Sequence, residues 1–193
     1  MMAKTHIAFA YSVALLPVAI YPELLNNTTA HETSIAFLGL TLGALLPDID
    51  EPNSKISRSS FVTFFFSWFL IFLGNKHRGI THKFIFFLVF LSIPTIGQFT
   101  NQIENGTTLL FFYFLSLGVL AHHLGDMMVG GGKNKGGIYN YFSPFYKNNK
   151  TTKFLPYILR CKINGLKEYG YLLIFTLFNI AVMANSALIK LTA

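Results

Sequence analysis

Long apolar segments separated by short polar connections dominate this chain. A bilayer-spanning helix needs roughly 20 largely apolar residues at ~1.5 Å per residue. The five predicted spans are residues 7–25, 33–47, 83–99, 107–125 and 169–190, and a shorter apolar run covers 61–73. The pattern predicts an all-α polytopic membrane bundle that forms one domain over residues 1–193, with about five spans and one shorter re-entrant or buried helix.

Composition supports a membrane protein. Hydrophobic residues make up 52% of the 193 residues, 21 residues are Phe, and only 12% are charged, which is more apolar surface than a soluble domain of this length can bury. The single cysteine, Cys161, excludes an internal disulfide.

The distribution of basic residues predicts the orientation. If 61–73 does not cross, 14 of the 15 Lys and Arg residues fall on one side, with Lys190 as the exception. This side is then cytoplasmic. The run 61–73 either enters the membrane and returns or lies buried against the bundle. The stretch 127–168 becomes a basic cytoplasmic loop, part loop and part surface helix. The net charge of +7 suits anionic lipid headgroups, or it simply enforces the topology.

Acidic and imidazole side chains stand at the ends of these apolar segments, and the predicted topology puts all of those ends on one face. They are His6, Asp48, Asp50, His82, His122 and Asp126. A mixture of imidazole and carboxylate ligands is typical of a site for a divalent metal ion.

The strongest local motif is Leu46-Pro47-Asp48-Ile49-Asp50-Glu51-Pro52. Its two prolines are expected to end the preceding helix and to keep the segment extended, so that Asp48 and Asp50 project to the same side. Two carboxylates this close repel each other unless a cation or a proton lies between them. The alternative is a solvated turn that only ends the helix.

A second motif, His77-Arg78-Gly79-Ile80-Thr81-His82, precedes the third span. His82 begins that span and is favoured as a ligand over His77, which needs the Gly79 turn to reach the same point. Thr81 or a backbone carbonyl is expected to hold the far nitrogen of the imidazole, and Arg78 is a candidate partner for an oxyanion or a phosphate.

His122 and Asp126 are four residues apart at the end of a span, so they share one helix face and can bind the same ion. Ionisable residues at this depth are costly and usually functional. His123 points about 100° away from His122 and is expected to be a neighbour of the site, not a ligand. His31 lies on the opposite side of the membrane.

The order of these motifs resembles a known family. The motifs are Thr5-His6, Leu46-Pro47-Asp48-Ile49-Asp50, His77-Arg78-Gly79-Ile80-Thr81-His82, His122 with Asp126, and Gly137-Ile138 before Pro144. Over roughly residues 1–150 they resemble the YdjM-like inner-membrane metal-dependent hydrolases. Glu51 departs from the family pattern, which often has His there, and so does Lys83, which often is Ser. The His, Asp, His and HxxxD order is also remotely similar to zinc phospholipase C and the P1-type nucleases, but their downstream HxxxE-like pair is missing, which argues against a three-zinc site.

These observations predict hydrolysis by a metal-activated water at the cytoplasmic face of an inner membrane. One or two divalent ions, with zinc favoured and manganese as the alternative, are expected on His6, Asp48, Asp50, His77, His82, His122 and Asp126. Asp48 or Asp50 is the candidate general base, and Arg78 binds the anionic substrate. The expected partners are membrane lipids and a phosphorylated or lipid-like substrate, with no nucleic acid. The alternatives are a divalent-metal transporter and a non-catalytic membrane protein.

Overall fold

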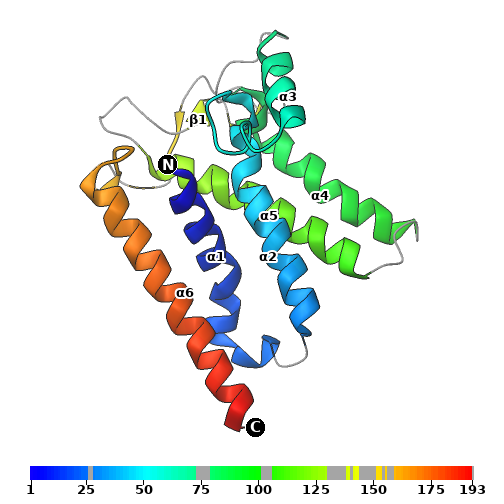
Figure 1. Ribbon diagram of the computed structural model, residues 1–193, viewed down its shortest axis with the longest axis vertical. Coiled ribbons are helices and arrows are strands. Elements are labelled where there is room, and N and C mark those ends of the chain that lie inside the picture. The colour runs from blue at the N-terminus through cyan, green and yellow to red at the C-terminus, as the bar shows by residue number, and fades with distance from the viewer. Residues whose placement is uncertain are drawn as a thin grey trace.

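The chain forms a bundle of helices in a computed structural model (Figure 1). The structure describes residues 1–25, 28–72, 79–100, 106–129, 138–139, 141–143, 151–153, 155 and 159–192. In chain order the elements are α1 (Ala3–Ile20), η1 (Pro22–Leu25), α2 (Ala30–Leu45), η2 (Leu46–Asp50), α3 (Phe61–Phe72), η3 (Ile80–His82), α4 (Phe84–Phe99), α5 (Gly106–Met128), β1 (Ile138–Tyr139), β2 (Thr151–Thr152) and α6 (Leu166–Thr192).

The all-α membrane fold is confirmed. Four helical segments are long and apolar enough to cross a membrane, namely Ala3–Ile20, Ala30–Asp50, Gly106–Met128 and Leu166–Leu188. The sequence pattern predicts about five spans, and the difference is α4. With 16 residues, α4 is only about 24 Å long at ~1.5 Å per residue, which is less than the ~30 Å of a typical hydrocarbon core.

Local sequence signals explain where the first two helices end and begin. Helix α1 ends at Ile20 because Tyr21 precedes Pro22, and a residue before proline disfavours the helical conformation. Helix α2 begins with a capping box in which the Thr29 side chain accepts a hydrogen bond from the Glu32 backbone and the Glu32 side chain accepts one from the Thr29 backbone.

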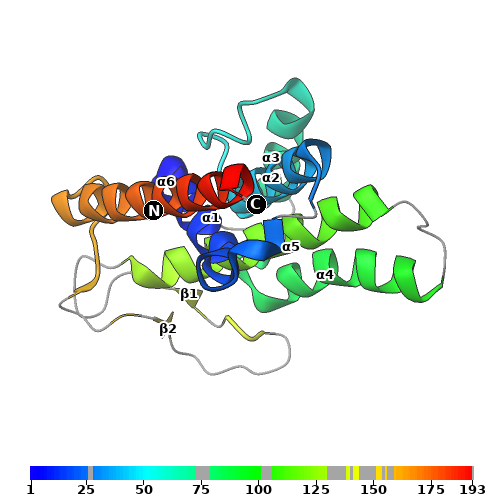
Figure 2. The ribbon, with the colours of Figure 1, turned by 90° about the horizontal axis from the view of Figure 1, so that it is seen from below.

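One end of the bundle collects the polar helix termini. In Figure 1, the start of α1, the end of α2, the start of α4 and the end of α5 lie at this end, whereas the C-terminus lies at the opposite end. Helices α4 and α5 lie side by side, as the view in Figure 2 also shows. Helix α6 packs along α1, where the Asn179 side chain donates to the Ala8 carbonyl at 3.0 Å and accepts from Ser12 at 2.9 Å.

Helix α3 lies beyond the polar end of the bundle and contacts η2 (Figure 1). Its side chains are mostly exposed: Ser67 is its one buried residue, and Phe61 and Phe72 are 77% and 85% exposed. The sequence predicts that residues 61–73 either enter the membrane and return or lie buried against the bundle. The exposure of α3 shows that its residues, 61–72, are not buried against the bundle.

The basic stretch 127–168 contains a short antiparallel pair in which Ile138 lies opposite Thr152. Among its described residues, no α-helix occurs between Met128 and Leu166, so the predicted surface helix is not seen there.

The closest helix packing joins α2 to α5. A methyl group added at Gly39 or Gly43 of α2 would overlap the backbone of α5, and one added at Gly118 of α5 would overlap the backbone of α2. Small residues of this kind allow helix backbones to approach each other in a membrane, where van der Waals packing drives association.

We expect Gly43→Ala to destabilise the protein by about 1–3 kcal/mol, because the new methyl group meets the Leu115 carbonyl, which cannot move without separating the helices. Thermal unfolding in detergent measures the loss. The matched control is Gly170→Ala in α6, where a methyl group meets no atom within 4 Å. Equal unfolding temperatures for the two variants would show that the close crossing does not limit stability.

Candidate metal centre

The two aspartates of the Leu46–Asp50 segment lie on a 3₁₀ helix, not on the extended strand that the prolines predict. Pro47 occupies the first turn of this helix, a position where proline needs no backbone hydrogen bond and continues the helical path. With three residues per turn, Asp48 and Asp50 project about a third of a turn apart. Asp50 is buried and the Asp48 side chain is 22% exposed, so the two carboxylates occupy different environments.

Asp50 lies behind the His82 ring. Its Oδ2 accepts a hydrogen bond from the Thr81 hydroxyl at 2.7 Å, and this hydroxyl lies 3.1 Å from His82 Nδ1. Because an ionised carboxylate only accepts, Thr81 donates its one proton to Asp50 and accepts from His82 Nδ1–H. The Nε2 of His82 therefore faces the other candidate ligands, and Asp50 suits the role of orienting His82.

His122 is oriented in the same way from α5. Its Nδ1 lies 2.7 Å from the Ala44 carbonyl, which can only accept, so Nδ1 carries the proton. Its Nε2 lies 3.3 Å from His82 Nε2. With both Nδ1 atoms donating, the two Nε2 lone pairs point at each other, and a proton or a metal ion must lie between them.

Asp126 lies between His82 and His6. Its Oδ2 is 3.6 Å from His82 Nε2, and its Oδ1 is 3.4 Å from His6 Nε2 and 3.0 Å from the amino group of Met1. The His6 ring stacks on His122 with ring centroids 3.8 Å apart, in space that Gly125 leaves free. Within the described residues, neither nitrogen of His6 makes a hydrogen bond, although the side chain is buried. A buried imidazole without a hydrogen bond is costly, which fits a ligand that awaits an ion.

The spacing of three donor atoms fits a shared metal ion. His122 Nε2 and Asp48 Oδ1 are 3.5 Å apart, His82 Nε2 and Asp48 Oδ1 are 3.7 Å apart, and the two Nε2 atoms are 3.3 Å apart. Metal–ligand distances of about 2.0–2.1 Å in a tetrahedral zinc site imply ligand atoms about 3.3–3.4 Å apart. The three separations lie within a few tenths of this value, and Asp126 Oδ2 lies 3.6 Å from His82 Nε2 beside this set.

A comparison with models of protein families matches residues 1–189 to YdjM inner membrane proteins. The chain belongs to this family. Searches of the curated proteins and of the solved structures found no match. For a YdjM family member, an inner-membrane location agrees with the four helices of spanning length.

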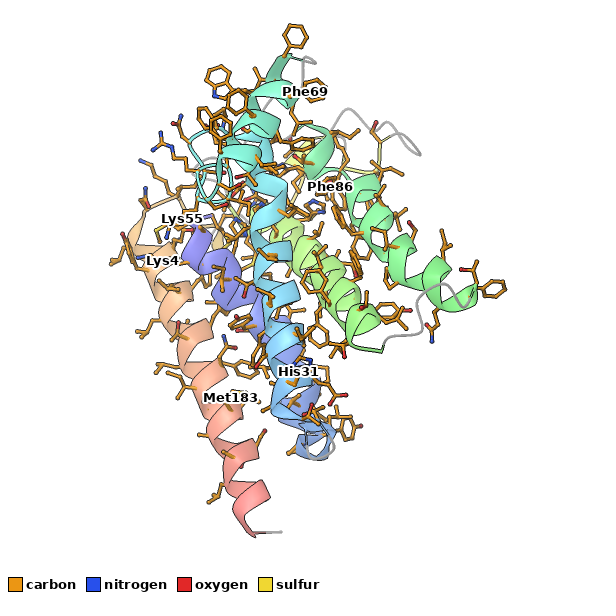
Figure 3. The ribbon with its side chains drawn as sticks, turned by 45° about the vertical axis from the view of Figure 1, so that its right-hand side comes forward. Lys4, His31, Lys55, Phe69, Phe86 and Met183 are labelled. Atoms are coloured by element: carbon orange, nitrogen blue, oxygen red, sulfur yellow. The ribbon has the colours of Figure 1, made fainter. Side chains whose placement is uncertain are left out.

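In this YdjM family member, the structure places all six residues predicted at the segment ends in one cluster. His77 and Arg78, also predicted for the site, lie outside the described residues. His123 is buried beside the cluster, as a neighbour of the site. Its contacts, and the ion pair between the Met1 amino group and Asp126, were not predicted. His31 lies at the other end of the bundle from Lys4 and Lys55, as predicted (Figure 3).

The pKa of His82 shows how the cluster balances its charge without an ion. Burial by itself lowers this pKa, but the nearby carboxylates of Asp48, Asp50 and Asp126 outweigh burial and raise it to about 9. In the metal-free protein, the His82 imidazolium thus supplies the positive charge that the carboxylates require.

We expect the metal-free protein to lose stability as pH rises. A folded-state pKa above the ordinary value of 6.5 means that the contribution of His82 is fully present below pH 6.5 and is lost as pH rises through about 9. It amounts to about 3 kcal/mol. Thermal unfolding with a chelator, compared between wild type and His82→Asn, isolates this contribution. A decline of equal steepness in both proteins would contradict it.

Proposed function

We propose that this protein is a membrane-bound metal-dependent hydrolase that cleaves a phosphoester at the cytoplasmic surface of the inner membrane. The observation that carries the proposal is the set of three donor atoms on Asp48, His82 and His122, whose separations of 3.3 to 3.7 Å fit a shared ion and whose two imidazoles are each held by hydrogen bonds at Nδ1. His6 and Asp126, which form a second candidate group with His122, adjoin this set.

His82, His122 and Asp48 would hold the ion, with Asp126 beside His82, and zinc is the metal that this donor set favours. When bound, such an ion lowers the pKa of its water and polarises the scissile group. His122 belongs to two candidate groups, one with Asp48 and His82 and the other with His6 and Asp126. Because His122 Nδ1 is bonded to Ala44, only Nε2 is left as a donor, and it cannot bind a separate ion in each group. A second ion would have to rely on His6 and Asp126.

Asp48 is the candidate general base. Its side chain is 22% exposed, whereas His82, His122 and Asp126 are at most 3% exposed, so Asp48 lies where the cluster opens toward the surface. A carboxylate that binds through one oxygen can accept a proton from water on the other. Asp50, which is bonded to Thr81, would keep the His82 ring in place.

The substrate proposal rests on charge and location. Exposed Lys4, Lys55 and Arg58 lie near the end of the bundle that carries the cluster, and Lys4 and Lys55 are visible there in Figure 3. Arg78 directly precedes the described Gly79, whose backbone lies 3.4 Å from Asp50. Basic side chains around a membrane-level metal site favour an anionic, lipid-like phosphoester. Transport of the ion would favour ligands near the middle of the membrane, but this cluster lies at helix ends.

We expect purified protein to retain a stoichiometric divalent ion and Asp126→Asn to retain much less, because Asp126 contacts both His82 and His6. Elemental analysis after purification without added metal measures the content. Glu51→Gln is the matched control, since this neighbouring carboxylate accepts from the Asn53 backbone, two residues along the chain.

Hydrolysis of phospholipids and soluble phosphodiesters in proteoliposomes should require the ion and fall at least ~100-fold in Asp126→Asn.

Metal-ion flux measured in the same vesicles distinguishes a hydrolase from the alternative, a divalent-metal transporter. Hydrolysis lost on chelation supports the proposal, whereas ion flux without hydrolysis, abolished by Asp126→Asn, would make the protein a transporter. Equal metal content in wild type and Asp126→Asn would show that Asp126 does not help to bind the metal, and would contradict the proposed metal site.

A further inference from the structure

His123 is completely buried beside the cluster, and both its ring nitrogens have partners from other segments. Its Nε2 lies 2.9 Å from the Thr81 carbonyl, and its Nδ1 lies 3.2 Å from the Tyr141 hydroxyl. A carbonyl only accepts, so Nε2 must carry the proton, and Nδ1 of the neutral ring then accepts from the Tyr141 hydroxyl. These two contacts fix one tautomer and one orientation of the His123 ring.

The residue that His123 holds, Thr81, is the one that orients His82. Thr81 belongs to η3, a 3₁₀ helix of three residues without a side-chain cap. Such a short element cannot maintain its own geometry, because its internal bonds are few and poorly aligned. Thr81 connects it to two other segments: its hydroxyl donates to Asp50, and its carbonyl accepts from His123.

We propose that His123 and Tyr141 are positioning residues that hold the Thr81 peptide and thereby keep His82 Nε2 directed at the metal centre. The hydrogen bonds run from the Tyr141 hydroxyl to His123, from His123 to the Thr81 carbonyl, and from His82 Nδ1–H through the Thr81 hydroxyl to Asp50. The part of this inference that concerns metal affinity rests on the proposed function, while the effect on His82 geometry does not.

Tyr141 connects the basic stretch 127–168 to this chain of hydrogen bonds. Its backbone carbonyl accepts from the Phe84 N–H at 2.9 Å, so the same residue also holds the start of α4, directly after His82. Its ring packs edge-on against His123, with centroids 5.4 Å apart. Residues on both sides of His82 are therefore fixed by one residue from the segment that follows β1.

Bound cobalt provides the test, because the visible absorption of Co²⁺ depends on the geometry of its ligands. We expect His123→Leu, which can neither donate to Thr81 nor accept from Tyr141, to weaken Co²⁺ binding about 10- to 100-fold and to change the spectrum. His123→Gln keeps one donor and one acceptor and should recover most of the affinity and the wild-type spectrum. Tyr141→Phe should weaken binding several-fold.

Tyr113→Phe is the matched control, since it removes a tyrosine hydroxyl whose partner, Gln98, lies at the far end of α4 and α5. Wild-type Co²⁺ affinity and spectrum in both His123→Leu and Tyr141→Phe would overturn the inference, even if both proteins were less stable. If His123→Leu does not fold, Tyr141→Phe decides: weaker Co²⁺ binding supports the inference, and wild-type affinity and spectrum overturn it.

A metal-free measurement separates this inference from the proposed function. In chelated protein labelled with ¹⁵N histidine, the ring signals of His82 should shift in His123→Leu and return in His123→Gln. Wild-type protein that binds no divalent ion would end the proposed function, and a change in the His82 signals would still support the positioning role. Unchanged His82 signals in His123→Leu would overturn that role.

Discussion

The close crossing of α2 and α5 sets the position of the candidate metal centre. Because Gly43 and Gly118 carry no side chain, the two backbones approach closely enough for the Ala44 carbonyl to reach His122 Nδ1 at 2.7 Å. This single bond gives His122 its orientation, and the same stretch of α2 continues into η2, which carries Asp48. A crossing with larger residues would separate the helices and move Asp48 away from His122.

Charge balance is the second constraint on the cluster. Three carboxylates and three imidazoles with little exposure cannot remain together without a cation, since buried like charges repel strongly and are poorly compensated by the protein interior. Protonated His82 and the Met1 amino group place positive charge beside these carboxylates. A divalent ion would displace the His82 proton, which is how metal affinity comes to depend on pH in sites of this kind.

Much of the fold and the membership of the cluster could be predicted because both depend on linear patterns. Uncharged runs identify membrane helices, and His or Asp at their ends must meet if the ends share one face, as His6, His82 and Asp126 do. The role of Asp50 was harder to predict, because two flanking prolines are compatible with an extended segment and with a 3₁₀ helix alike, and only the helix turns Asp50 behind His82. The short α4 was likewise hidden, because apolar residues continue up to its last turn.

His123 is a neighbour of the cluster and not one of its candidate ligands, as its direction about 100° from His122 predicts. Spacing along the helix could not show what His123 contacts. In the folded chain, the turn before α4 covers that face, so His123 meets Thr81 instead of lipid.

The donors of the cluster come from α1, η2, η3 and α5, whereas the remainder of the bundle is held by apolar packing and a few polar contacts such as Asn179 with Ala8. An ion held by Asp48, His82 and His122 would tie η2, η3 and α5 together, and its binding free energy would add directly to the stability of the folded state. Metal binding therefore depends on how the segments pack, since His122 is oriented by its bond to the α2 backbone and His82 by its bond to Thr81.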